Sequence, residues 1–163
     1  MSALTRTSAE HRKKLNSHVD GLPALADQIG KVPAADLAVG LSDVYDFLVE
    51  NLIPHMEAVE ASVYPELDRL LSDSGAMAPM AREHKEIRAL IDELGRLRGR
   101  MHEAEPKGID SIALRRVLYR LHALLKVHLA EEELYLPVLE HSVGPEEAVE
   151  LARALDHGAR IGL

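Results

Sequence analysis

Cysteine is absent from the 163 residues of this chain, which excludes disulfide bonds, thiolate metal ligands and cysteine nucleophiles. Any metal ion must therefore be held by nitrogen and oxygen donors. Tryptophan is absent too, phenylalanine occurs once, and aromatic residues make up only 3% of the chain. The core must then be built mainly from leucine and alanine, which suit close-packed helices better than a sheet.

Basic clusters and long apolar runs are also missing. Lysine and arginine number 19 against 27 aspartates and glutamates, the net charge is −8, and no basic stripe or aromatic platform stands out. Nucleic acid is therefore not an expected partner. No apolar run approaches the roughly 20 residues of a membrane-spanning helix, and the N-terminal residues contain no apolar segment of a secretory signal. We accordingly expect a cytoplasmic protein without a membrane partner.

Two common kinds of catalytic motif do not occur. No serine stands in the context of a nucleophile elbow, which argues against a hydrolase triad. The 10 glycines form no phosphate-binding loop. The nine histidines are therefore the main clue to function.

Apolar residues recur at helical spacing along four long segments, which predicts an all-α fold. Short connections make consecutive helices antiparallel, so we expect one domain over residues 1–163. Its expected architecture is an up-down-up-down four-helix bundle with a short fifth C-terminal helix that stops near Gly158. Prolines should bend the long helices. The expected long helices run from Thr7 to Gly30, from Pro33 to the loop at 72–75, from Pro79 to Glu103 and from Asp110 or Ser111 to Pro137, with bends at Pro23, Pro54 and Pro65.

Each of the four long helices carries a histidine at an inward-facing position. The clearest case is His128, because Glu132 follows it by four residues on the same helix face, roughly 6 Å away along the axis. An imidazole and a carboxylate placed in this way can hold one hard or borderline metal ion. With His55 and His84 on two other helices, the pattern predicts a metal site in the bundle core rather than a plain bundle with polar core histidines.

The first helix offers two candidate ligands, His11 and His18. They face the same way but lie about 10.5 Å apart along the axis, which is too far for both to bind one ion. Counting from one end of the bundle favours His11, and counting from the other favours His18. Both remain candidates.

Two positions near the predicted site are ambiguous. Glu60 follows His55 by five residues, about 140° round a regular helix, so it reaches the same ion only if the helix is distorted. The alternative is that Glu60 is a surface acid. Arg88 lies four residues after His84 on the same stripe, and a buried arginine needs an anionic partner such as Glu60 or Glu132.

The ordered set of these motifs resembles the hemerythrin-like, or HHE cation-binding, domain over nearly the whole chain. The resemblance implies a four-helix bundle with a non-haem, usually di-iron, centre in its core. Members of that family bind oxygen, store or sense iron, respond to nitric oxide or decompose peroxide. The resemblance rests on Ala9-Glu10-His11, Asn16-Ser17-His18-Val19, Pro54-His55 through Val63-Tyr64-Pro65, Glu83-His84-Lys85-Glu86-Ile87-Arg88 and the segment from Leu121 to Glu133.

The family pattern has a His on the first helix, His-x-x-x-Glu on the second, His-x-x-x-His on the third, and His with a carboxylate four or five residues later on the fourth. This chain departs from it twice: Val59 stands in place of the glutamate, leaving the displaced Glu60, and Arg88 stands in place of the second histidine. These two departures from the family pattern predict a reduced site with one ion, or with a weakly held second ion. The matching positions are His18 or His11, His55, His84, and His128 with Glu132 or, as an alternative carboxylate, Glu133.

Three functions are compatible with these residues. The first is a metal-binding protein that acts in the binding or sensing of oxygen, nitric oxide or iron. The second is a non-haem iron enzyme that decomposes peroxide or activates oxygen, with Tyr64 as a candidate proton donor. The third is a metal-free helical interaction module. Only the resemblance favours iron, since the donors also suit Mn or Zn, and each function is compatible with a homo-oligomer.

Overall fold

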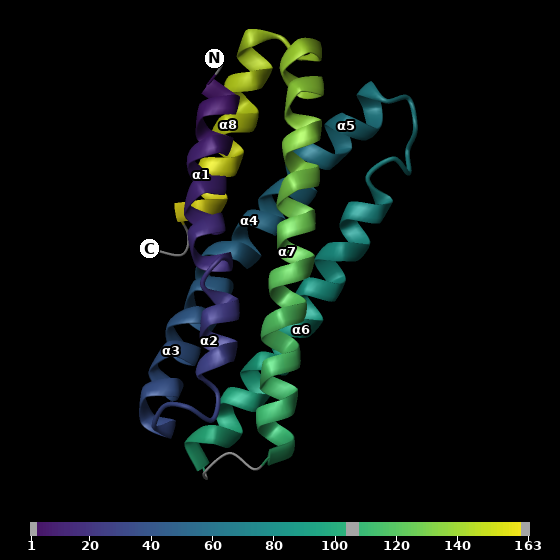
Figure 1. The fold of residues 1–163 in the computed structure, drawn as a ribbon. Helices are drawn as coiled ribbons and strands as arrows, with labels where there is room; N and C mark the ends of the chain where they lie inside the picture. The colour runs from purple at the N-terminus through teal and green to yellow at the C-terminus, as the bar shows by residue number, and fades with distance from the viewer. Residues whose placement is uncertain (1–2, 104–107, 161–163) are drawn as a thin grey trace.

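The computed structural model describes residues 3–103 and 108–160, and these residues form helices without any strand (Figure 1). This confirms the predicted all-α fold. Two of the segments, η1 and η2, are π-helical. The elements in chain order are α1 (Ala3–Val19), α2 (Leu22–Gln28), α3 (Ala34–Phe47), η1 (Leu48–Leu52), α4 (Ile53–Ala58), η2 (Val59–Val63), α5 (Tyr64–Leu70), α6 (Ala78–Glu103), α7 (Gly108–Ser142) and α8 (Pro145–Arg160).

The elements combine into four long rods that alternate in direction along the molecule (Figure 1). The first rod is α1 with α2, interrupted just before Pro23. The second runs without a break from α3 to α5, and α6 and α7 are the third and fourth. Helix α8 returns beside α1, so the predicted bundle with a fifth helix is confirmed. Pro137 lies inside α7 and does not end it.

Both π-helical segments stand immediately before a proline turn of the second rod. The Ile53 N–H bonds to the Leu48 carbonyl, and the Tyr64 N–H bonds to the Val59 carbonyl, each five residues back. A proline in a helix has no N–H to donate, and its ring collides with the carbonyl four residues earlier. Widening the preceding turn by one residue relieves that collision. The bends predicted at these prolines therefore take the form of π turns, and the rod continues.

The apolar interior consists of two clusters along the bundle. The larger one joins α1, α2, the second rod from α3 to α4, α6 and α7, and the smaller one joins η2, α5, the start of α6, α7 and α8. On α6, His84 lies between Met80 of the smaller cluster and Ile87 of the larger. Each fully buried aliphatic side chain contributes about 1.5–3 kcal/mol relative to exposure, so the two clusters hold the rods firmly around this polar position.

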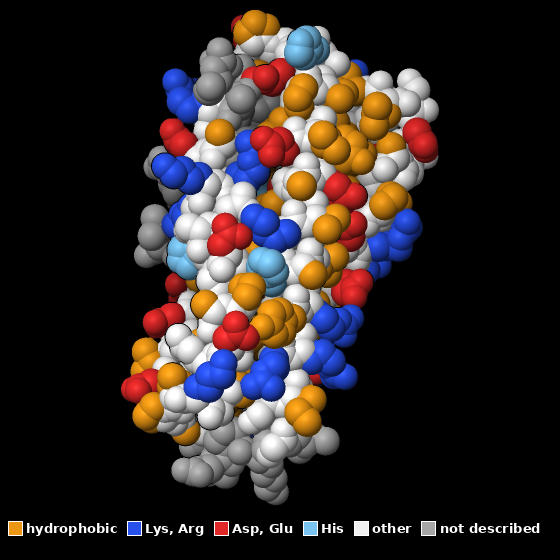
Figure 2. All heavy atoms as spheres, viewed as in Figure 1, with side chains coloured by type: hydrophobic (Ala, Val, Ile, Leu, Met, Phe, Trp, Pro, Cys, Tyr) orange, Lys and Arg blue, Asp and Glu red, His pale blue; other side chains and the backbone are white. Residues whose placement is uncertain are grey.

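The face in Figure 2 mixes charges of both signs with apolar side chains, which gather most densely over the upper part of α7 and α5. Among the large apolar side chains of the described residues, Leu134 is the most exposed at 72%, followed by Ile112 and Val39 at 66% and 62%. None of the helices in the described residues combines the length and the apolar character needed to cross a membrane.

Candidate metal centre

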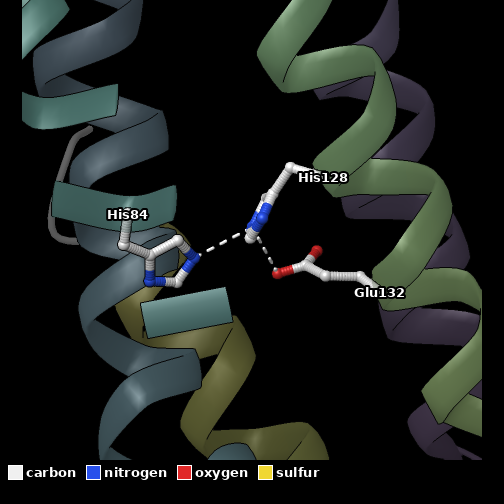
Figure 3. A group of neighbouring side chains, drawn as sticks. All are labelled: His84, His128 and Glu132. Carbon is white, nitrogen blue, oxygen red and sulfur yellow. Dashed lines mark hydrogen bonds and ion pairs between the residues drawn. The ribbon is translucent and has the colours of Figure 1, made fainter. Parts of the chain in front are cut away.

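Three side chains from two neighbouring rods converge in the interior (Figure 3). His84 comes from α6, and His128 and Glu132 come from α7. One donor atom of each lies within 4.8 Å of the others. The two Nε2 atoms are 2.9 Å apart, and His128 Nε2 is 3.3 Å from Glu132 Oε1. Both imidazole rings are fully buried, so these donors face one another away from solvent.

Two further carboxylates hold the outer nitrogens of these histidines. His84 Nδ1 lies 2.6 Å from Glu60 Oε1, and His128 Nδ1 lies 2.8 Å from Glu83 Oε2. A carboxylate only accepts hydrogen bonds, so each Nδ1 carries a proton and donates it. The Nε2 atom of a neutral imidazole with that tautomer carries a lone pair. The lone pairs of His84 and His128 therefore point at the same place.

A positive charge at this place satisfies the converging donors. Burial and the neighbouring His128 lower the pKa of His84 to about 4, so this ring stays neutral. Burial also acts to lower the pKa of His128, but the hydrogen bonds and charges of Glu132 and Glu83 outweigh it, and the pKa is raised. The site thus favours either a proton on His128 or a metal cation between the three donors.

Glu132 is the acid of this group, and it stays ionised. Burial acts to raise its pKa, but the charge of His55 and the close approach of His128 Nε2, 3.3 Å from Oε1, outweigh burial, so the pKa is strongly lowered. Its Oε1 atom is buried and has no hydrogen-bond partner, and Oε2 lies 3.3 Å from His55 Nε2. A buried carboxylate oxygen without a donor, next to two imidazole lone pairs, is chemically suited to a cation. The residues present therefore fit a metal ion.

Glu60 lies behind His84 rather than beside His55. It sits in η2, and its carboxylate accepts from His84 on one side and from both terminal nitrogens of Arg88, at 2.9 and 3.3 Å, on the other. Burial acts to raise the pKa of Glu60, and the hydrogen bonds from Arg88 and His84 lower it further than burial raises it. Glu60 is thus the anionic partner expected for Arg88. It orients His84 from outside the converging group.

A second pair of histidines flanks Glu132 on the side of its other oxygen. His55 Nε2 faces Glu132 Oε2, and the His11 ring lies edge-on to the His55 ring with the centroids 6.4 Å apart. The Nδ1 atoms of both rings are buried without a hydrogen-bond partner. His11 also lies 3.9 Å from Asp156 of α8. Burial and then the neighbouring His55 lower the pKa of His11, which keeps the ring neutral.

The other candidate on the first helix points elsewhere. His18 is exposed and stacks on Phe47, with the ring centroids 3.7 Å apart, and its Nδ1 lies 3.0 Å from the Lys14 carbonyl. Of the two alternatives, only His11 lies beside the histidines of the interior. The alternative carboxylate Glu133 is 63% exposed and pairs with Arg12.

The sequence did not predict that Glu83 and Tyr64 contact His128 and His84. Glu83 holds His128 across the gap between α6 and α7. The Tyr64 hydroxyl lies 3.2 Å from His84 Nε2, on the side of the converging donors. Burial, and then the charges of Glu132, Glu60 and Glu83, raise the pKa of Tyr64, so the phenol remains protonated and can donate a hydrogen bond.

A small cavity of about 40 Å³ adjoins this group. It reaches Tyr64 and Glu132, and it has room for one or two molecules the size of water. Its walls are otherwise mainly apolar. The wall residues come from α1, α7, α8 and the second rod, and include Leu15, Val59, Leu67, Leu139 and Leu155.

The fold and this group of donors define the class of protein as a helical bundle with a cation-binding interior. Residues 4–139 match the family model described as Hemerythrin, the hemerythrin HHE cation binding domain. The match covers most of the chain, which therefore belongs to this family. No match was found among the curated proteins or among the solved structures.

Proposed function

We propose that this protein holds one non-haem iron ion through His84 Nε2, His128 Nε2 and the carboxylate of Glu132. Two imidazoles and one carboxylate are the donors typical of mononuclear non-haem iron sites with open positions. The main support is the orientation of the two histidines. The Nδ1 atoms of His84 and His128 donate to carboxylates, while their Nε2 atoms and Glu132 face the same place. Metal-binding histidines in proteins are oriented in this way by their outer nitrogens. The same donors also accept Mn or Zn.

The role that we propose for this centre is the binding or sensing of a small diatomic ligand, oxygen or nitric oxide. A ferrous ion with three protein donors supplies open positions for such a ligand. The adjoining cavity of about 40 Å³ has mainly apolar walls, and its size suits a small ligand better than a large one. The protonated hydroxyl of Tyr64 reaches the same place and supplies a hydrogen-bond donor.

The pair His11 and His55 supports at most a weaker second position. A second ion there would share Glu132 with the first. The family's glutamate on the second helix is Val59 in this chain, so no further carboxylate of that helix offsets the charge of a second ion. We therefore infer that the centre binds one ion tightly at His84, His128 and Glu132, and that His11 and His55 bind a second ion weakly or not at all.

The test is the metal content of tag-free protein, measured by elemental analysis with an absorption spectrum of the same sample. We expect about one iron per chain and no band typical of an oxo-bridged pair. His128→Ala should lose the ion, because it removes a buried donor that no neighbour replaces. His18→Ala is the matched control, since His18 is exposed and stacks on Phe47, and it should keep the ion.

Two results would contradict this proposal in different ways. Two tightly bound irons per chain would show that the His11 and His55 half is complete. No bound metal after exposure to ferrous iron, Mn²⁺ and Zn²⁺ would instead favour the metal-free interaction module.

A further inference from the structure

The charges around the proposed centre are unequal in number. Three carboxylates contact the two histidines: Glu132, Glu60 and Glu83. A single guanidinium, that of Arg88, contacts this group through Glu60. Glu131 interacts with Glu83, and burial and Glu83 raise its pKa. Arg88 is therefore the one cationic side chain among the groups in contact with the histidines or their carboxylates in the described residues.

Arg88 is held in place by a two-point contact with Glu60. Its two terminal nitrogens hold the two oxygens of Glu60, and the Glu60 oxygen that accepts at 2.9 Å also accepts from His84 Nδ1 at 2.6 Å. Two hydrogen bonds thus separate the guanidinium from a proposed ligand. The side chain is 29% exposed, so solvent screens its charge only in part.

Such a charge acts differently on ions of different valence. The repulsion between a fixed unit charge and an ion grows in proportion to the charge of the ion. A trivalent ion at the centre therefore feels Arg88 half as strongly again as a divalent ion does. The remaining surroundings of His84 would be more negative without Arg88 and would favour the higher charge.

We propose that Arg88 is a specificity-determining residue that biases the centre towards a divalent rather than a trivalent ion. This inference rests on the proposed metal site and adds a property of that site. In the family pattern a neutral histidine stands at this position, so the substitution changes the charge as well as the number of donors. For iron, the consequence is a higher reduction potential, because the ferrous state is favoured.

The experiment compares two redox-inert ions, Zn²⁺ and Ga³⁺, in the full chain. Their dissociation constants are measured by competition with nitrilotriacetate, and the preference is the ratio of the two affinities. Arg88→Gln should raise the affinity for Ga³⁺ relative to Zn²⁺ roughly tenfold, which is the Coulomb effect expected at an effective dielectric constant of about 20. In iron-loaded protein, a tenfold change corresponds to a potential lower by about 59 mV for one electron.

Two control variants separate charge from other effects. Arg88→Lys keeps the positive charge and should leave the preference within about twofold of the wild type. Arg98→Gln removes the same charge from the same helix, about 15 Å further along the axis. Arg98 has a similar exposure, 26% against 29%, and pairs with Asp46, so it should leave the preference unchanged.

Glu60 gives an independent check of the same charge balance. Glu60→Gln keeps an oxygen that can accept from His84 but removes a negative charge, so the preference should move towards Zn²⁺. The double variant Glu60→Gln with Arg88→Gln leaves the total charge as in the wild type, and its preference should return close to that of the wild type. The double variant also leaves no charge unpaired, which guards against misfolding of Arg88→Gln alone.

The outcomes distinguish this inference from the site on which it rests. If Arg88→Gln binds both ions with the same preference as Arg98→Gln, the role of Arg88 is wrong while the metal site stands. If the wild type binds neither Zn²⁺ nor Ga³⁺, the proposed function fails, and the inference fails with it.

Discussion

At the scale of single residues, this centre depends on which nitrogen of each buried histidine carries the proton. Glu60 and Glu83 come from different elements but take the same role, because each accepts from an Nδ1 atom at 2.6–2.8 Å. His84 and His128 are thereby turned so that their Nε2 atoms face inward. The fold thus orients the donors of the proposed centre in advance, which would reduce the cost of ordering them when an ion binds.

Removal of Glu83 tests this orienting role. Glu83→Ala deletes the acceptor of His128 Nδ1 but no proposed ligand, and we expect the affinity for Zn²⁺ to fall about 10- to 100-fold. Isothermal titration calorimetry measures it. Glu86→Ala is the matched control on the same helix, because Glu86 is 55% exposed and pairs with Arg120. Equal affinities in the two variants would mean that His128 needs no support.

Sequence spacing predicted the pair on one helix but not the contact between helices. His128 and Glu132 share a face because the helical period relates them, and the structure brings their side chains to 3.3 Å. Glu83 on α6, by contrast, contacts His128 on α7. That contact depends on the relative rotation of α6 and α7, which spacing along either helix does not contain.

At the scale of elements, the second rod combines regular and widened turns. The sequence predicted a distortion near Pro54 or Pro65 and made the role of Glu60 depend on it. The distortion occurs, as η1 and η2. Glu60 lies in η2 and points towards α6, where its carboxylate accepts hydrogen bonds from His84 and Arg88. A proline predicts the bend, but the new direction is decided by packing against the neighbouring rod.

Helix α6 carries two glycines whose surroundings differ sharply. A Cβ atom added at Gly95 would lie 2.8 Å from Cε2 of Tyr45 on α3, whereas one added at Gly99 meets nothing within 4 Å. We expect Gly95→Ala to lower the free energy of unfolding by about 1–3 kcal/mol through overpacking. Gly99→Ala should raise it by up to about 1 kcal/mol, since alanine favours a helix.

Urea denaturation followed by circular dichroism compares the two glycine variants. The two substitutions are chemically identical and lie one turn apart, so their difference measures the contact between α3 and α6. Equal stabilisation by both would show that Tyr45 moves aside at little cost.

At the scale of the whole molecule, the polar layer of histidines lies between two apolar clusters. Ile87 and Leu129 belong to the larger cluster, and Val59 and Met80 belong to the smaller. The donors of the proposed centre come from two rods that both clusters hold together. An ion bound there would stabilise the bundle as one unit, because the unfolded chain does not bring these donors together.

Metal should therefore raise the stability of the whole chain. At a free Zn²⁺ concentration about 100 times the dissociation constant, the free energy of unfolding should rise by about 2.7 kcal/mol. Differential scanning calorimetry with and without the ion measures the shift. His128→Ala should abolish it, while His141→Ala, at an exposed position of the same helix, should keep it. A melting temperature indifferent to metal would count against the centre.

Helix α8 begins after residue 139, where the family match ends, yet it completes the surroundings of the centre. Leu155 forms part of the cavity wall, and Asp156 faces His11. A wall on a separate helix can open by a local movement, which costs less free energy than global unfolding. Under the proposed function, the helix would therefore bear on residence time: the packing of α8 would set how long a small ligand stays, while the donors of α6 and α7 would set how tightly it binds.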